Sequence, residues 1–232
     1  MKIGVLLSGS GVYDGAEIQE SVLVLLALSQ AGVEYFCIAP NIEQHHVINH
    51  LNGEEMNEKR NVLTEAARIA RGNIKDLAEI TANDMDGLVM PGGFGVAKNF
   101  TKWAFEGANG EINADVKRLV NEMVKQHKPI AAVCMSPTTV AKALEGTGIE
   151  ANLTVGTTQE ASPYQIADIN GEMEKVGAKP EMCSVTEVIS DDANNIVSSP
   201  CYMMEASISE VNEGIQKTIA KLVEMVALQT ES

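Results

Sequence analysis

Apolar runs bounded by glycine, proline or polar residues alternate along this chain with segments of helical periodicity. Apolar runs at 3–7, 35–39, 87–91 and 129–133 predict buried strands. Patterns at 16–31, 61–71, 112–126 and 136–144 predict helices that follow or precede these strands. This alternation favours β-α-β connections, so the sequence predicts an α/β fold with a mostly parallel sheet.

The rest of the chain departs from this alternation. Residues 43–60 are polar, and 47–54 predict a hairpin with Asn52-Gly53 at its turn. The pattern further predicts a short strand or loop at 73–81 and a polar loop with helical turns at 96–111. After the 136–144 helix it predicts a strand at 153–156, a helix at 159–168, a hairpin of 185–189 and 196–199 around Asp191-Asp192, and an amphipathic helix at 206–228. No repeat or linker is visible, so we expect one domain over 1–232 with a hairpin insertion near 43–60.

The charge balance excludes two classes of partner. The chain has 17 Lys and Arg against 32 Asp and Glu, a formal net charge of −15, and only 4% aromatic residues. An acidic surface repels nucleic-acid phosphates and anionic membranes, and few aromatic side chains are available for base stacking. We expect a small-molecule substrate, with neither nucleic acid nor membrane as partner.

The four cysteines, Cys37, Cys134, Cys183 and Cys201, form no C-x-x-C pair and no Cys/His cluster with zinc spacing. The apolar run near the N-terminus is too short for a signal peptide or a membrane span. These features predict a cytoplasmic protein with reduced thiols and no metal or other cofactor.

Cys134 carries the strongest chemical signal. It joins the apolar run 129–133 to the helix predicted at 136–144, with the small residues Ala132 and Ser136 on either side. A tight nucleophile elbow needs small neighbours, and Pro137 suits a first helical turn. A helix N-terminus favours thiolate over thiol. A buried cysteine at a strand end with no catalytic role gives the same pattern, and both interpretations remain open.

Two glycine-containing turns flank the predicted sheet edge. Gly92 and Gly93 follow the 87–91 strand, and their N–H groups, with that of Met135, could hold an oxyanion beside Cys134. Gly11, after the first strand, is a further candidate for contacting substrate. Neither turn completes a nucleotide-binding motif, and simple tight turns would look the same.

Glu17 and Glu20 lie on one face of the first predicted helix, just after the first strand. Ligands bind at the carboxyl ends of parallel strands, so both are candidate catalytic acids. Helix-dipole compensation explains Glu17 well, whereas Glu20 lies further along the helix. The histidines in the polar hairpin lack supporting carboxylates and are more typical of a surface than of a metal site.

Four segments resemble the ElbB family, the enhancing lycopene biosynthesis or isoprenoid biosynthesis proteins with an amidotransferase-like domain, within the ThiJ/PfpI superfamily. They are residues 4–20, 47–54, 60–72 and 90–95. The resemblance spans nearly the whole chain. It implies a flavodoxin-like three-layer sandwich, a nucleophile-elbow cysteine at Cys134 paired with an acid at Glu20, and a homodimer.

The resemblance further implies glyoxalase chemistry that needs neither glutathione nor metal. The protease-like members carry His directly after the cysteine, where this chain has Met135, and Thr157 and Thr158 offer no substitute. We therefore predict a Cys-Glu glyoxalase acting on small α-oxoaldehydes such as glyoxal and methylglyoxal. The alternative is a non-catalytic redox-sensing or regulatory module of isoprenoid metabolism, because an accessible reactive thiol is also oxidised readily.

Overall fold

The computed structural model describes residues 1–232. Its central sheet has seven strands in the order β10-β11-β7-β6-β1-β2-β5, all parallel except for the antiparallel edge pair β10-β11. These strands are Ile189–Asp191, Ile196–Ser199, Ile130–Val133, Gly87–Met90, Lys2–Leu6, Glu34–Ala39 and Ile74–Asp76. The predicted α/β class with a mostly parallel sheet is confirmed.

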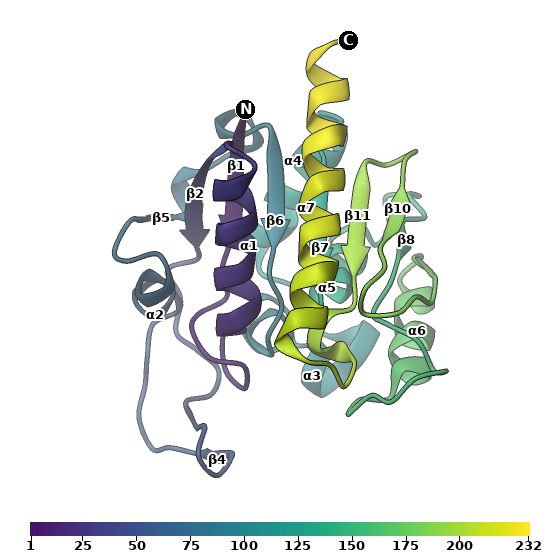
Figure 1. Ribbon diagram of the computed structural model, residues 1–232. Helices are drawn as coiled ribbons and strands as arrows, with labels where there is room; N and C mark the ends of the chain where they lie inside the picture. The colour runs from purple at the N-terminus through teal and green to yellow at the C-terminus, as the bar shows by residue number, and fades with distance from the viewer.

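Helices cover both faces of the sheet. In Figure 1, α1 (Ile18–Gln30) and α7 (Ile208–Thr230) lie side by side in front of it, while α4 (Ala114–Lys125) and α5 (Ser136–Ala143) lie behind. The central strands β6, β7 and β11 are fully buried, because helices cover both of their faces. One contiguous core of 58 buried residues joins the three layers.

Smaller elements connect this framework. They are the hairpin strands β3 (Ile48–Asn49) and β4 (Glu54–Glu55), α2 (Val62–Ile69), the 3-10 turns η1 (Leu77–Glu79), η2 (Ala82–Asp84), η4 (Gly107–Asn109) and η5 (Cys201–Met203), the π-helical turn η3 (Val96–Phe100), α3 (Trp103–Glu106), β8 (Asn152–Leu153), α6 (Ile166–Lys175) and β9 (Lys179–Pro180). The predicted hairpin, the helical turns within 96–111 and a strand within 73–81 are all present.

Two predicted elements are wrong. The strand predicted at 153–156 is limited to β8, which pairs with β9 instead of joining the main sheet. The Thr154 hydroxyl accepts the N–H of Gly156 at 3.1 Å, and this local bond ends the strand. The helix predicted at 159–168 begins only at Ile166, because the Ser162 hydroxyl donates to the carbonyl of Met203 and holds the preceding segment in a turn.

Other predicted boundaries shift by a few residues. The first arm of the 185–199 hairpin begins at Ile189, since the Ser184 carbonyl accepts the N–H of Glu187 and closes a turn before it. Asn113 caps α4 with its side chain, so that helix begins at Ala114 rather than at 112.

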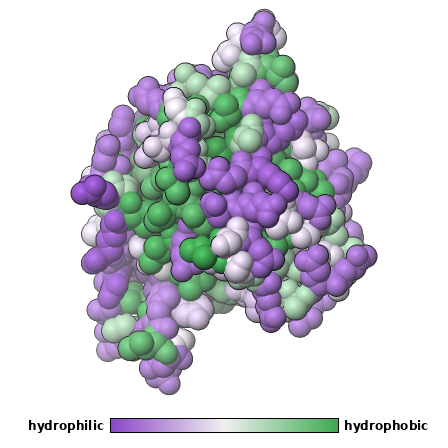
Figure 2. Space-filling model, in the orientation of Figure 1, coloured by the Kyte–Doolittle hydropathy of each residue, from purple (hydrophilic) through white to green (hydrophobic).

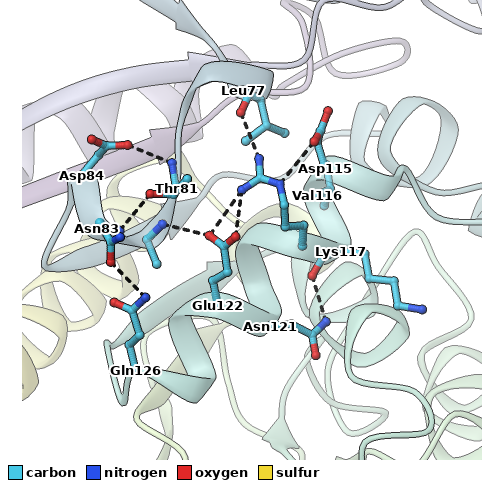
Figure 3. A network of polar contacts seen from close by, with 12 residues as sticks. Leu77, Thr81, Asn83, Asp84, Asp115, Val116, Lys117, Asn121, Glu122 and Gln126 are labelled. Atoms are coloured by element: carbon cyan, nitrogen blue, oxygen red, sulfur yellow. Dashed lines mark hydrogen bonds and ion pairs between the residues drawn. The ribbon is translucent and has the colours of Figure 1, made fainter.

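A polar network fastens the segment between β5 and β6 to α4 (Figure 3). The Arg118 guanidinium donates to the Leu77 carbonyl at 3.2 Å and to both carboxylate oxygens of Glu122. Glu122 in turn accepts the N–H of Ala82 at 3.0 Å. The backbone groups of this connection therefore have hydrogen-bond partners on α4, which lies on the same side of the sheet as α5.

The carboxyl ends of the parallel strands lie at the lower end of the sheet in Figure 1, where α1 and α5 begin. The strand order places the ends of β6, β7 and β11 next to one another, with β1 beside β6. Residues that are distant in sequence therefore meet at this edge.

Candidate active site

Cys134 occupies a sharp turn between β7 and α5. Its φ is +59°, in the left-handed region that non-glycine residues adopt uncommonly. The turn is held from both sides: the Cys134 N–H donates to the Ser199 carbonyl at 2.9 Å, and the Ser136 hydroxyl donates to the Pro91 carbonyl at 2.7 Å. The side chain is only 6% exposed. This is the geometry of a nucleophile elbow, with the strain of the turn supported by the two neighbouring strand ends.

Glu20 brings a fully buried carboxyl group to the same place. One oxygen, Oε1, accepts the Gly92 N–H at 3.0 Å, and the other, Oε2, accepts the Tyr202 N–H at 3.3 Å. The side chain of Cys134 lies beside this carboxylate: a Cβ built at position 92 would lie 2.7 Å from Oε1 of Glu20 and 2.8 Å from the Cys134 sulfur. Glu20 thus links the loops that follow β6, β7 and β11.

Burial dominates the protonation of this pair. It raises the pKa of Glu20 from 4.5 to about 8, with the negative charge of Glu17 adding to the rise. Burial and the Glu20 charge raise the pKa of Cys134 well above its ordinary value, while the nearby Gly93 N–H opposes this. The helix N-terminus alone predicted a stabilised thiolate, and desolvation outweighs it. The two groups share a site that loses one proton near neutral pH, and the first negative charge opposes loss of the second.

Glu17 is the N-cap of α1. Its carboxylate accepts the Glu20 N–H, at 2.6 Å, and burial raises its pKa. Because the Glu17 carboxylate caps the helix, we infer that Glu17 positions α1 and raises the pKa of Glu20, and that it does not contact substrate.

Gly92 and Gly93 lie against the reactive pair. A Cβ at position 92 would lie 2.3 Å from the Cβ of Cys134 and 2.7 Å from Oε1 of Glu20. Gly93 has a φ of +98° and directs its N–H at the sulfur, while the N–H of Met135 has no acceptor in the protein. These two donors flank the position that an oxyanion on a Cys134 adduct would occupy.

Gly11 is not part of this cluster. Its N–H donates to the carbonyl of Ala16 at 2.8 Å, so it is not free for a substrate. A Cβ there would lie 2.8 Å from the ring of His50 and 2.9 Å from the carboxylate of Asp14. Gly11 instead gives the polar hairpin room to approach the loop after β1.

Aromatic side chains surround the approach to Cys134. Tyr164 packs edge to face on Phe94, with ring centroids 5.8 Å apart. Burial, together with the Cys134 and Glu20 charges, raises the pKa of Tyr164 to about 12. Phe94 borders two pockets of about 250 and 370 Å³, the first reaching Met135 and the second reaching Tyr13. The first pocket therefore reaches the residue that follows Cys134, and it is a small, mostly apolar entrance next to the elbow.

His50 fixes the polar hairpin over this entrance. Its Nε2 accepts the Tyr13 N–H at 3.2 Å, and its Nδ1 lies 3.1 Å from the Ile48 carbonyl. These partners require a neutral ring protonated on Nδ1. The ring also stacks on Tyr13, with centroids 4.8 Å apart. Nothing in the sequence pattern indicated that His50 would fasten the hairpin.

Several other residues at the site were missed. Tyr164 lies within the helix predicted at 159–168 and Tyr202 lies between two predicted elements, and neither position carried a chemical signal. Cys201 had a signal that was overlooked, since it follows the carboxyl end of a strand as Cys134 does.

Helices on both faces of a mostly parallel sheet, with a buried cysteine on an elbow at its centre, define the class I glutamine amidotransferase-like fold. The chain belongs to the DJ-1/PfpI family, whose profile matches residues 11–199. No helix has the length and apolarity needed to cross a bilayer.

Two named relatives match nearly the whole length of this chain. The chain is 38% identical over 226 residues to the mitochondrial ES1 protein homolog of Rattus norvegicus, covering 97% of this chain and 84% of that protein. It is equally similar to human mitochondrial glutamine amidotransferase-like class 1 domain-containing protein 3, covering 83% of that protein.

Two solved structures illustrate the similarity of this chain to known folds. The isoprenoid biosynthesis protein with amidotransferase-like domain from Ehrlichia chaffeensis superposes with a TM-score of 0.87 at 38% identity, covering 97% of this chain and 99% of that chain. Drosophila melanogaster DJ-1beta superposes with a TM-score of 0.56 at 18% identity, covering 99% and 95% of the two chains, and shares the fold.

Proposed function

We propose that this protein is a glutathione-independent glyoxalase that converts small α-oxoaldehydes such as glyoxal and methylglyoxal to 2-hydroxy acids. One observation carries the proposal: the buried Glu20 carboxyl, whose pKa burial raises to about 8, lies beside Cys134, with both groups against position 92. A general base works best when its pKa lies near the operating pH. The site thus has a nucleophile and a proton carrier in contact.

The first step is addition of the thiol to the aldehyde. The Cys134 sulfur attacks the aldehyde carbon while its proton passes to the Glu20 carboxylate. The N–H groups of Gly93 and Met135 stabilise the negative charge that develops on the aldehyde oxygen. That oxygen then takes the proton from Glu20, which gives a neutral hemithioacetal and restores the Glu20 carboxylate.

The second step moves a hydrogen between the two carbons. Glu20 removes the proton from the former aldehyde carbon, which gives an enediol, and returns a proton to the neighbouring carbon. The product is a thioester of the 2-hydroxy acid on Cys134. Water hydrolyses it and restores the thiol, so the net reaction adds one water and needs no external oxidant or reductant.

The surroundings of the thiol suit a small, uncharged substrate. The pocket beside Met135 is about 250 Å³ and includes Phe94 and Trp103. Asp168 and Glu172 on its rim disfavour anions. Small α-oxoaldehydes meet both conditions.

The test is turnover of methylglyoxal and glyoxal by the wild type, Cys134→Ala and Glu20→Gln, with the 2-hydroxy acid product quantified. We expect each substitution to lower kcat/KM by at least about 100-fold, because each removes a group that takes part in bond making. Cys183→Ala is the matched control, since Cys183 is buried and hydrogen-bonds Thr154 away from this pair. Equal turnover by wild type and Cys134→Ala would end the proposal.

Three further assignments accompany it. We propose that the chain is one domain, which the single core supports, and that it is an ElbB-type member of its family, which the similarity to the Ehrlichia chaffeensis protein supports. We propose a homodimer in the cytoplasm. Exposed Ile18, Val22 and Leu26, four residues apart on α1, form an apolar stripe within the hydrophobic surface at the front of Figure 2, and such a stripe suits burial against a second copy.

A redox-sensing module is the second candidate function. A specific observation favours it: Cys201, a second buried cysteine, lies two residues past Ser199, whose carbonyl accepts the Cys134 N–H. Mild peroxide followed by mass spectrometry tests this candidate. Oxidation of Cys37 while Cys134 stays reduced would exclude it.

A further inference from the structure

Cys201 stands at the end of the strand next to Cys134. The parallel register of β11 and β7 pairs Ser199 with Val133, and the Ser199 carbonyl accepts the Cys134 N–H. Cys201 follows Ser199 by two residues, with a φ of +49° and no exposed surface. Two buried thiols, each on a left-handed turn, therefore occupy adjacent strand ends.

The two thiols share Glu20. The residue after Cys201, Tyr202, donates its N–H to Oε2 of Glu20. Burial and the charges of Glu20 and Glu17 raise the pKa of Cys201 well above its ordinary value, while the Cys134 N–H lowers it. The Ser199 carbonyl, bonded to Cys134, and the Tyr202 N–H, bonded to Glu20, place Cys201 between two contacts of the reactive cluster, although the glyoxalase steps do not use it.

We propose that Cys201 is the resolving thiol for Cys134, so that oxidation by a hydroperoxide ends in a Cys134–Cys201 disulfide. This deepens the redox candidate by naming its second residue, and it does not require aldehyde turnover.

The chemistry balances within the cluster. The Cys134 sulfur attacks the outer oxygen of the hydroperoxide, which becomes the sulfenic acid oxygen while the alcohol or water leaves; sulfur is oxidised and the peroxide reduced. The Cys201 sulfur then attacks the sulfenic sulfur and passes its proton to Glu20. The departing hydroxide takes up a proton and leaves as water, and the disulfide remains.

The site favours this route over further oxidation of Cys134. Sulfinic acid requires a second peroxide to reach a sulfur that is only 6% exposed. Cys201 follows the end of the adjacent strand in the same molecule, so its attack needs no diffusion of a second reactant. The disulfide would occupy the nucleophile, so it would also switch off any thiol addition to aldehydes, reversibly on reduction.

The experiment is a peroxide titration of the full-length protein, followed by alkylation of free thiols, digestion and mass spectrometry without reduction. We expect the wild type to lose two hydrogen atoms in mass, to yield a peptide pair joining Cys134 to Cys201, and to recover both thiols with a reductant. In Cys201→Ala we expect Cys134 to accumulate as sulfinic acid instead. Cys183→Ala should behave as wild type.

The mapping in the wild type keeps the test independent of whether Cys201→Ala folds. Sulfinic acid at Cys134 with a free thiol at Cys201 would overturn the proposal, as would a disulfide that joins Cys134 to Cys37 or Cys183. Loss of aldehyde turnover in untreated protein bears only on the glyoxalase proposal.

Discussion

The main-chain N–H of Gly92 donates a 3.0 Å hydrogen bond to Oε1 of Glu20, although 72 positions separate these residues in the chain. The bond holds a buried carboxyl against the loop that touches Cys134. The orientation of the proposed proton carrier therefore depends on how closely that loop approaches.

The first prediction concerns Gly92→Ala. The added methyl would lie 2.3 Å from the Cβ of Cys134, so the loop or the cysteine must move. We expect a loss of about 1–3 kcal/mol in the free energy of unfolding from overpacking, measured by denaturant titration, together with loss of aldehyde turnover. Gly171→Ala is the control: Gly171 has open space around it in α6, so that variant should be at least as stable as the wild type. Full turnover by Gly92→Ala would contradict the close approach of position 92 to Cys134.

The second prediction is the pH dependence of Cys134 alkylation. Because the pKa of Glu20 is about 8, the pair gains its first negative charge as pH rises through that value. That charge is on the carboxylate, which can accept the thiol proton as the sulfur attacks, so the rate of iodoacetamide alkylation at Cys134 should increase between about pH 7 and pH 9. Glu20→Gln cannot carry this negative charge, so the pH dependence of its alkylation rate should differ from that of the wild type. Superimposable profiles for the two proteins would show that the thiol titrates independently of Glu20.

The third prediction is a stability dependence with a definite sign. Folding raises the pKa of Glu20 from 4.5 to about 8, so the folded state binds the proton more tightly than the unfolded state. The contribution of the protonated group is complete below pH 4.5 and is lost as pH rises through about 8. At most this costs on the order of 5 kcal/mol. Thermal unfolding should show Glu20→Gln gaining on wild type as pH rises from about 5 to about 9. A constant difference would contradict the raised pKa.

The fourth prediction tests the proposed dimer through α1. Val22 is 49% exposed at the centre of the apolar stripe. Val22→Glu places a charge where a partner would bury the side chain, so light scattering after gel filtration should show a shift from dimer to monomer. Thr64→Glu, at an exposed position on α2, adds the same charge away from the stripe and should leave the dimer intact. A monomeric wild type, or a dimeric Val22→Glu, would count against this surface.

The fifth prediction concerns His50. His50→Ala removes the acceptor for the Tyr13 N–H and the donor to the Ile48 carbonyl, which together fasten the hairpin at the site entrance. We expect faster proteolysis within 47–56 and a raised KM for aldehyde with a smaller change in kcat, because His50 does not touch the reacting groups. Leu51→Ala is the control, since Leu51 is 97% exposed at the hairpin tip. Unchanged proteolysis would show that other contacts hold the hairpin.

The sequence predicted the parallel sheet because buried strands such as 129–133 form short, wholly apolar runs with clear boundaries. It failed at 153–168, where side-chain hydrogen bonds from Thr154 and Ser162 to the backbone decide the conformation. The Thr154 bond joins residues only two positions apart, and the Ser162 bond needs a partner distant in the chain, the Met203 carbonyl. Local periodicity cannot represent them.

The candidate site likewise has some features that local sequence predicts and others that it does not. Cys134 could be found from the small residues around it, and Glu20 came from its place after the first strand together with the family resemblance. The raised pKa of Glu20 follows from burial by several elements at once, so no local motif encodes it. Cys201 and His50 act through neighbours that only the sheet order and the hairpin contact bring near.

The adjacency of the ends of β6, β7 and β11 also links thiol chemistry to folding. Glu20, Gly92, Cys134 and Cys201 come from four parts of the chain, and only the assembled parallel sheet brings them together. Contacts between residues so far apart in sequence form late, after the local helices. A chain still folding, or one released before its last strand is in place, holds four ordinary cysteines and no reactive pair. The characteristic reactivity of Cys134 therefore marks a molecule whose folding is complete.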